Sequence, residues 1–195
     1  MACKMRVAFL TAILGVGLSA CGHVPITSLY SLWKIDFETT DPGKIRAAIK
    51  LPRMIKPRAG GMHLRIAVKA GDAPEVAEDF ALVEVTDQDE LRALDYAIDL
   101  GTSVYAYRIL DKDVPRLEAF RSTLLQKKQQ GASGTLSIAI VPEACRTGPL
   151  PRGSLLFSTY LRTSETGTYV PLTADVDLHT LDSKRDIAAL IPLCA

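Results

Sequence analysis

The sequence is poor in the side chains that most often carry out chemistry. Its 195 residues include three histidines, four cysteines and one tryptophan. It has no Cys-x-x-Cys pair, no phosphate-binding Gly-x-x-x-x-Gly-Lys-Ser/Thr loop, no Gly-x-Gly-x-x-Gly turn and no Gly-x-Ser-x-Gly elbow. The sequence therefore predicts no catalytic residue and no cofactor.

Neither sign of charge is in excess along the whole chain. The 23 basic and 22 acidic side chains give a formal net charge of +1 at pH 7. A chain with this balance has no overall field that would draw it to a polyanion. We therefore expect no nucleic-acid partner.

The N-terminus has the three regions of a secretory signal peptide, in order. Lys4 and Arg6 supply positive charge, residues 7–17 form an uncharged and mainly apolar stretch, and the stretch ends at Leu18-Ser19-Ala20-Cys21. The apolar stretch is about half of the roughly 20 residues that a helix needs to cross a bilayer. The pattern predicts a signal peptide at residues 1–20 rather than a transmembrane anchor.

The motif Leu18-Ser19-Ala20-Cys21 resembles the lipobox of bacterial lipoprotein precursors. The resemblance implies that Cys21 is acylated, with palmitate as a typical chain, and becomes the new N-terminus. Acyl chains buried at about 0.8 kcal/mol per methylene would hold the protein on a membrane. An ordinary secretory signal with a chance cysteine at the cleavage site is the alternative.

Gly22 follows the lipobox cysteine. In Gram-negative lipoproteins an aspartate at this position is the usual signal for retention in the inner membrane. The resemblance therefore favours a lipid-anchored protein on the periplasmic face of the outer membrane.

The remaining chain has the length of one domain with its own core. We expect a lipidated tether at residues 21–27 and an α+β domain at residues 28–195. Cys145 and Cys194 then remain as an even pair in an oxidising compartment, which predicts a disulfide. Two separate buried thiols are the alternative, because spacing alone does not show that two cysteines come within bonding range.

Hydrophobic periodicity predicts the secondary structure. Strands are expected at residues 28–38, 62–69, 80–85, 103–110, 135–141, 155–163 and 168–178, with the strand at 135–141 of the buried type. Helices are expected at residues 41–51, 87–100 and 113–131, the second of them weak and the third the best capped. Turns are expected at residues 57–61 and 165–167.

An internal similarity suggests how these elements are arranged. A shift of 72 residues aligns residues 32–37 with 104–109, Asp41 with Asp113, and 63–68 with 135–140. The similarity predicts two βαββ repeats that form a two-layer sandwich, an antiparallel sheet with two helices on one face. Chance likeness between similar patterns is the alternative.

Charge is segregated within the chain. Residues 42–71 contain no acidic side chain, whereas residues 72–99 contain a single basic one, Arg92. The candidate binding patch consists of Lys44, Arg46, Lys50, Arg53, Lys56 and Arg58. This patch would dock anionic lipid headgroups or a partner protein. In the alternative, the two runs neutralise one another across neighbouring strands, as Arg65 or Lys69 near Glu84 would do.

Asp175, Asp177 and His179 occupy alternate positions of an expected strand, so all three would share one face. Carboxylate and imidazole groups at this spacing are possible metal ligands. A half-exposed strand has the same pattern without any metal, and no further ligands accompany these three. The sequence therefore predicts no metal site.

Tyr105, Tyr107 and Tyr160 would line a ligand groove if they shared a face, since an aromatic ring with a polar tip suits that role. Tyrosines on strands are more often part of the core or of an ordinary sheet face. The sequence does not separate these two interpretations.

These observations favour a non-catalytic, membrane-anchored envelope protein that binds or assists an envelope protein partner. The alternative is a periplasmic protein that binds a small molecule or lipid in a groove between sheet and helices. A hydrolase without a recognised motif is a third possibility, so catalysis is left open. A cavity of several hundred Å³ with an apolar lining would favour the ligand binder, and a flat exposed apolar patch would favour the protein partner.

Overall fold

A computed structural model describes residues 25, 28, 34–69, 74–131, 134–180 and 186–194. The predicted signal peptide, the lipobox with Cys21 and most of the tether lie outside the described residues. So do residues 29–33 of the strand expected at residues 28–38.

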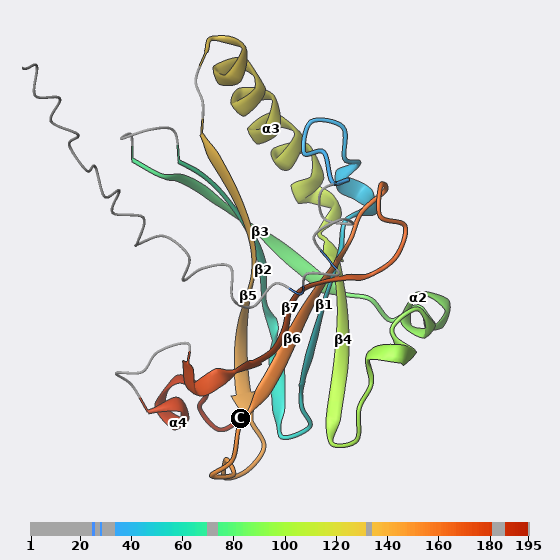
Figure 1. Ribbon diagram of the computed structural model, residues 1–195, viewed down its shortest axis with the longest axis vertical. Helices are drawn as coiled ribbons and strands as arrows, with labels where there is room; N and C mark the ends of the chain where they lie inside the picture. The colour runs from blue at the N-terminus through green and yellow to red at the C-terminus, as the bar shows by residue number, and fades with distance from the viewer. Residues whose placement is uncertain are drawn as a thin grey trace, which may run out of the picture.

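A curled, seven-stranded antiparallel sheet with the strand order β5-β2-β3-β4-β1-β6-β7 dominates the fold (Figure 1). The strands are β1 (Arg46–Pro52), β2 (Ile55–Lys69), β3 (Val76–Glu84), β4 (Thr102–Ile109), β5 (Thr135–Arg146), β6 (Leu156–Arg162) and β7 (Val170–Asp177). The inner, concave face holds the main core, to which side chains from every strand contribute. The fold is therefore α+β with an antiparallel sheet, as the sequence predicts.

The helical elements are short, with one exception. They are α2 (Gln88–Arg92), α3 (Val114–Gln129) and α4 (Ile187–Leu190), and the 3-10 turns η1 (Pro42–Lys44), η2 (Asp95–Ala97), η3 (Asp111–Asp113) and η4 (Leu178–Thr180). Helix α3 confirms the helix expected at residues 113–131, with a proline in its first turn and Gly131 just after its end at φ +88°. Asp113 precedes it but makes no side-chain capping hydrogen bond.

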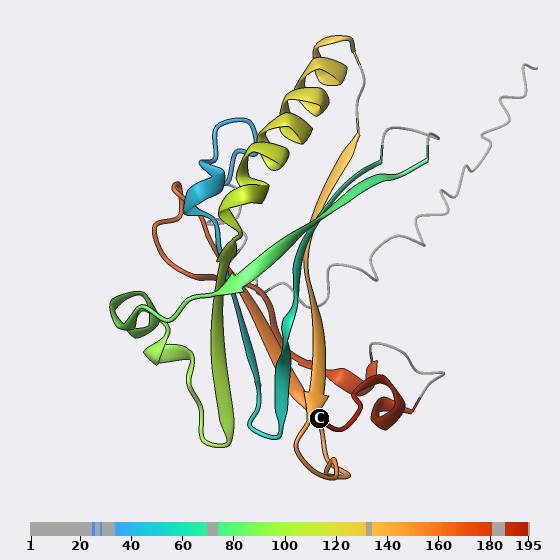
Figure 2. The ribbon, with the colours of Figure 1, turned by 180° about the vertical axis from the view of Figure 1, so that it is seen from behind.

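Helix α3 packs on the inner face of the sheet mainly through its first half. Leu117 and Phe120 are buried there, and the Phe120 ring lies 6.3 Å from the ring of Phe80 on β3. The second half of α3 extends away from the sheet, and the nearby ends of β2, β3 and β5 diverge from it (Figures 1 and 2).

The helix expected at residues 41–51 is wrong. Asp41 does act as a cap, since its Oδ1 accepts a hydrogen bond of 2.9 Å from the amide of Gly43. The helical part ends after the single turn η1, and the chain continues as β1, which is buried on both faces at Ala48 and Ile49. Apolar residues on both faces of a strand fit helical spacing equally well, so periodicity does not separate the two.

Three other predictions are corrected by the described residues. Residues 34–38 consist of turns and irregular backbone, not the end of a strand. The strand β5 is an exposed edge of the sheet, not a buried strand. Residues 57–61 do not separate two strands but lie within β2, where its register with β5 shifts between Pro57 and Met62.

The two-helix layer and the repeat are not confirmed. The first expected helix is strand β1, the weak prediction at residues 87–100 consists of α2 and η2, and α3 is the one long helix of the described part. The matched segments 63–68 and 135–140 do lie side by side, because β2 pairs with β5.

The predicted disulfide is present. Cys145 at the end of β5 is bonded to Cys194, with the two Cα atoms 5.0 Å apart. The amide of Arg146 donates to the carbonyl of Pro192 at 2.8 Å, and the amide of Cys194 donates to the carbonyl of Arg146 at 2.9 Å. The C-terminal segment is therefore fastened beside β5 by both covalent and hydrogen bonds.

Replacing both cysteines, as in the double variant Cys145→Ser and Cys194→Ser, should lower the free energy of unfolding. The bond closes a loop of about 50 residues, for which chain entropy predicts about 4 kcal/mol. Urea denaturation with and without reductant measures the effect. Reductant should destabilise the natural chain and leave the double variant unchanged, and equal stability of the natural chain in both conditions would contradict the prediction.

Candidate functional site

A cleft of about 480 Å³ lies between the second half of α3 and the ends of β2 and β5. Its apolar lining consists of Phe37, Val68, Leu124, Leu125 and Leu136. Val68 on β2 and Leu136 on β5 are direct cross-strand partners, so their side chains form one wall. Leu124 and Leu125 on α3 form the other.

The cleft follows from how α3 meets the sheet. Leu117 and Phe120 anchor the helix on the core, and Leu124, one turn later, is only half-buried. The sheet ends diverge from α3 beyond this point (Figure 2), and the apolar side chains that line the cleft are not covered by another described element. Phe37 also lines a smaller cavity of about 20 Å³ deeper in the core.

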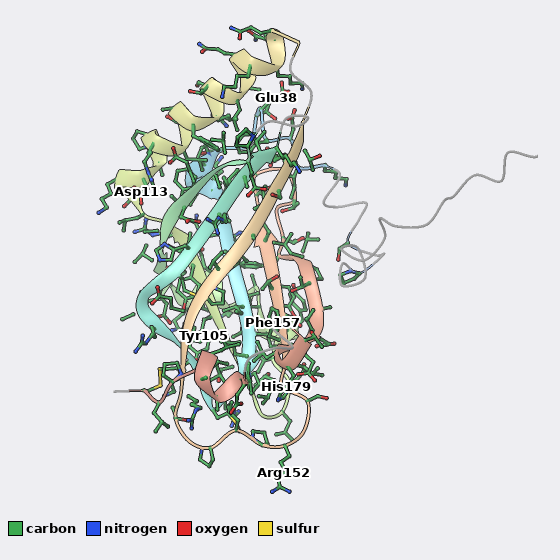
Figure 3. The ribbon with its side chains drawn as sticks, turned by 90° about the vertical axis from the view of Figure 1, so that its left-hand side faces the viewer. Glu38, Tyr105, Asp113, Arg152, Phe157 and His179 are labelled. Carbon is green, nitrogen blue, oxygen red and sulfur yellow. A yellow bond between two sulfur atoms is a disulfide. The ribbon has the colours of Figure 1, made fainter. Side chains whose placement is uncertain are left out.

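The rim of the cleft is polar. Lys128 near the end of α3 is ion-paired with Glu38, which Figure 3 labels, and this contact raises the pKa of Lys128. Asp36 accepts a hydrogen bond of 2.9 Å from the amide of Glu38. Lys127 forms no ion pair within the part of the chain that the structure describes. An apolar floor with a charged rim suits an amphiphilic ligand.

The six residues of the predicted basic patch do not form one unpaired surface. Arg46 and Lys50 lie on the outer face of β1 and are ion-paired with acidic residues. Lys44 lies 3.6 Å from a carboxylate oxygen of Asp41. Arg53, Lys56 and Arg58 are exposed and have no ion pair with described residues.

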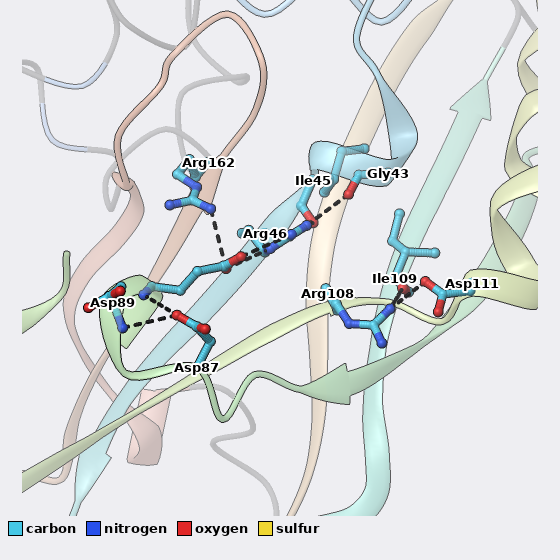
Figure 4. Close-up of polar contacts among 10 residues, drawn as sticks. Gly43, Ile45, Arg46, Asp87, Asp89, Arg108, Ile109, Asp111 and Arg162 are labelled. Carbon is cyan, nitrogen blue, oxygen red and sulfur yellow. Dashed lines mark hydrogen bonds and ion pairs between the residues drawn. The ribbon is translucent and has the colours of Figure 1, made fainter. Parts of the chain in front are cut away.

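Glu90 of α2 bridges Arg46 and Arg162 on neighbouring strands, and Figure 4 labels these two arginines. Its Oε2 lies 2.8 Å from Nε of Arg46 on β1 and 3.3 Å from Nη2 of Arg162 on β6. The hydrogen bond from Arg46, with the positive charges of both arginines, lowers the pKa of Glu90 despite its partial burial. The carboxylate therefore stays ionised at neutral pH.

Lys50 is the second cation on the outer face of β1. Its Nζ lies 2.8 Å from Asp99 and 3.3 Å from Asp175. Burial acts to lower the pKa of Lys50, but the hydrogen bonds and charges of these carboxylates outweigh burial, and the pKa is raised. Asp175 has a positive φ of 50° and its amide donates to Oγ of Ser158, the cross-strand neighbour of Lys50.

The segment from α2 to η2 covers the outer face between these two ion pairs. Leu94 and Ala97 are buried against Ala48, Ala106 and Tyr160. Glu90 and Asp99 lie near the two ends of the segment, so the acidic run of the sequence neutralises cations of the basic run, as the alternative interpretation holds.

The particular ion pair that the sequence suggested for Arg65 does not form. Arg65 lies 3.4 Å from Asp79, which is its direct cross-strand partner on β3, rather than near Glu84. The principle of neutralisation across strands is right, and the partner is wrong because the register between β2 and β3 cannot be derived from composition.

Asp175, Asp177 and His179 do not share a strand face. Asp175 binds Lys50, and His179 lies in η4 with its Nδ1 2.7 Å from Asp177. The hydrogen bonds from the His179 side chain and amide lower the pKa of Asp177 to about 2. Within the described ranges no three histidine, cysteine or carboxylate side chains are placed to hold a metal.

The three tyrosines do not line one groove. Tyr107 is buried in the main core and Tyr105 packs against it, whereas Tyr160 is buried under the outer cover. Sequence reasoning also missed the cleft, since none of its lining residues was predicted as a binding residue. Leu125 was the available signal, since it is an apolar residue beside the face that α3 uses for the core.

Comparisons with known proteins give no relative. The chain matches no protein-family model, and no similar curated protein or solved structure was found. In the part of the chain that the structure describes, no helix has the length and apolar character to span a membrane.

Replacing Glu90 by glutamine should lower the free energy of unfolding by about 1–3 kcal/mol, because the partly buried Arg46 and Arg162 lose their shared carboxylate. Urea denaturation measures the change. Asp89→Asn is the matched control on the same helix, since its exposed pair with Arg92 should contribute less than about 0.5 kcal/mol. Equal effects of the two variants would contradict the role of Glu90 as the shared carboxylate of Arg46 and Arg162.

Proposed function

We propose that this protein is a lipid-anchored, non-catalytic binding protein of the bacterial envelope, and that the cleft beside α3 takes an apolar ligand. The observation that carries the proposal is the cleft itself. Its volume of about 480 Å³ falls in the range of about 300–1,000 Å³ that is usual for ligand sites, and its floor is apolar.

The envelope location rests on the N-terminal pattern and agrees with the Cys145–Cys194 disulfide, since disulfides persist in oxidising compartments. In the proposal, residues 1–20 are removed, Cys21 carries the lipid, and residues 21–27 tether the folded part on the periplasmic face of the outer membrane.

The non-catalytic role rests on the side chains around the cleft. Among the residues that the structure describes, the titratable groups there are Asp36, Glu38, Lys127 and Lys128. The ion pair with Glu38 keeps Lys128 charged, so this amine is no nucleophile or general base at neutral pH. These groups are suited to positioning a charged headgroup.

A second candidate is an accessory subunit that binds an envelope protein. The turn before β4 favours it, because Ile98 and Leu100 are 51% and 101% exposed. This turn is hydrogen-bonded to the β1–β2 turn through the Arg53 amide and the Gly101 carbonyl at 2.9 Å, at the end of the sheet opposite α3 (Figures 1 and 2). Exposed apolar side chains on a fixed turn are suited to a protein partner.

Filling the cleft should weaken ligand binding. With dansyl-undecanoic acid as the probe, Leu136→Trp should reduce the affinity about tenfold or more, because the larger side chain fills the cleft. A tenfold loss of affinity corresponds to about 1.4 kcal/mol of binding free energy. Val141→Trp is the matched control, because Val141 is 38% exposed and Leu136 39% on the same strand, but Val141 does not line the cleft. Binding is measured by fluorescence titration. Absence of saturable binding to the natural chain, or an equal loss of affinity in both variants, would refute the cleft as a ligand-binding site.

The anchor and the partner are tested in cells. Labelled palmitate should enter the natural chain and not the Cys21→Ala variant, and equal labelling of both would contradict the lipoprotein assignment. Crosslinking followed by mass spectrometry tests the second candidate. A protein partner lost in Leu100→Asp and retained in Leu136→Trp would establish the accessory role instead of the cleft.

A further inference from the structure

The outer face of the sheet carries a pair of arginines whose charge is only half neutralised. Arg46 and Arg162 are direct cross-strand partners on β1 and β6. Like charges in this position repel one another, so a bridging anion is needed. Glu90 supplies one negative charge between two positive ones. One positive charge is left over in this group of three.

The two arginines differ in how their N–H groups are used. Arg46 donates from Nη1 to the carbonyls of Gly43 and Ile45, at 2.8 and 3.1 Å, and from Nε and Nη2 to Glu90. Within the described residues, the guanidinium of Arg162 makes one hydrogen bond, from Nη2 to Glu90. Arg162 therefore holds the free donors and the unmatched charge.

A buried hydroxyl beside Arg162 also lacks a partner. Tyr169 is 5% exposed, and its Oη has no hydrogen-bond partner among the residues that the structure describes. The guanidinium carbon of Arg162 lies 5.2 Å from the centre of the Tyr169 ring. The backbone carbonyl of Tyr169 accepts a hydrogen bond of 2.9 Å from the hydroxyl of Tyr96. The group of Tyr169 without a described partner is therefore the phenol hydroxyl and not the carbonyl.

The phenol lies within electrostatic reach of the same charged groups. Burial raises the pKa of Tyr169, the positive charges of Arg162 and Arg46 act to lower it, and the charge of Glu90 acts to raise it. Buried hydroxyls in folded proteins almost always have a partner, and one without is commonly matched by a bound ion or water.

We propose that a phosphate group binds at Arg162 and Tyr169, beside the Arg46–Glu90 pair. A tetrahedral oxyanion presents oxygens in several directions. In the proposal it accepts from the free guanidinium donors of Arg162, and it reaches the phenol oxygen, which is closed to solvent, when the side chains around this hydroxyl move apart. Arginine is the residue best matched to phosphate because of its fixed fork of donors. The bound group neutralises the remaining positive charge.

This site is independent of the cleft and goes beyond the proposed function. Free phosphate and the phosphodiester of a lipid headgroup share the required chemistry. The two probes are therefore inorganic phosphate and glycerophosphoglycerol, the headgroup of phosphatidylglycerol without its acyl chains. Calorimetric titration of the full chain at low ionic strength measures each affinity.

Three variants test whether the probes bind at this site. Arg162→Gln should abolish saturable binding, because it removes the free donors and the unmatched charge. Tyr169→Phe retains the ring and removes only the hydroxyl, so its expected loss of about tenfold in affinity is independent of any folding defect. Arg65→Gln removes an arginine that is paired with Asp79 on another part of the sheet, and should leave the affinity unchanged.

Binding of either probe with this pattern of variants supports the site, and the tighter probe identifies the source of the phosphate group. Absence of saturable binding of both probes to the natural chain overturns the proposal. Binding that survives in Arg162→Gln also overturns it, because the phosphate would then bind elsewhere.

Discussion

Strand β1 lies inside the sheet and carries two cations, Arg46 and Lys50, on a face that is covered rather than open to water. A charge removed from water is costly unless a counter-charge and hydrogen bonds replace the solvent. Glu90 and Asp99 meet this requirement from the two ends of the α2–η2 segment. The position of that segment, and the small core it closes over Ala48, follow from this constraint.

The same constraint explains the charge segregation of the sequence. The basic run lies on β1 and β2, and the acidic run that follows returns alongside both, on β3 and across the outer face. Each run is thereby brought against the other, with Arg65 beside Asp79 as a second instance. The unpaired positive surface is consequently smaller than the sequence alone suggests, because only Arg53, Lys56 and Arg58 of the predicted patch have no ion pair with described residues.

Several elements could be predicted from local signals. Proline and Gly131 mark the ends of α3, alternation marks β3 and β4, and Gly167 marks the turn between β6 and β7 at φ +64°. Strand β1 could not be separated from a helix, because burial on both faces removes the alternation that identifies a strand. The exposed position of β5 depends on strand order, which is a property of the whole sheet and not of its own residues.

The cleft was not predictable, because it arises where α3 and the strand ends diverge, and no sequence pattern records that angle. Native mass spectrometry of the protein isolated from cells tests the cleft most directly. Our account predicts one bound molecule with an acyl chain, in addition to the proposed anchor, that is absent from the Leu136→Trp variant. Release of the protein with no bound molecule, or the same bound mass in the variant, would contradict it.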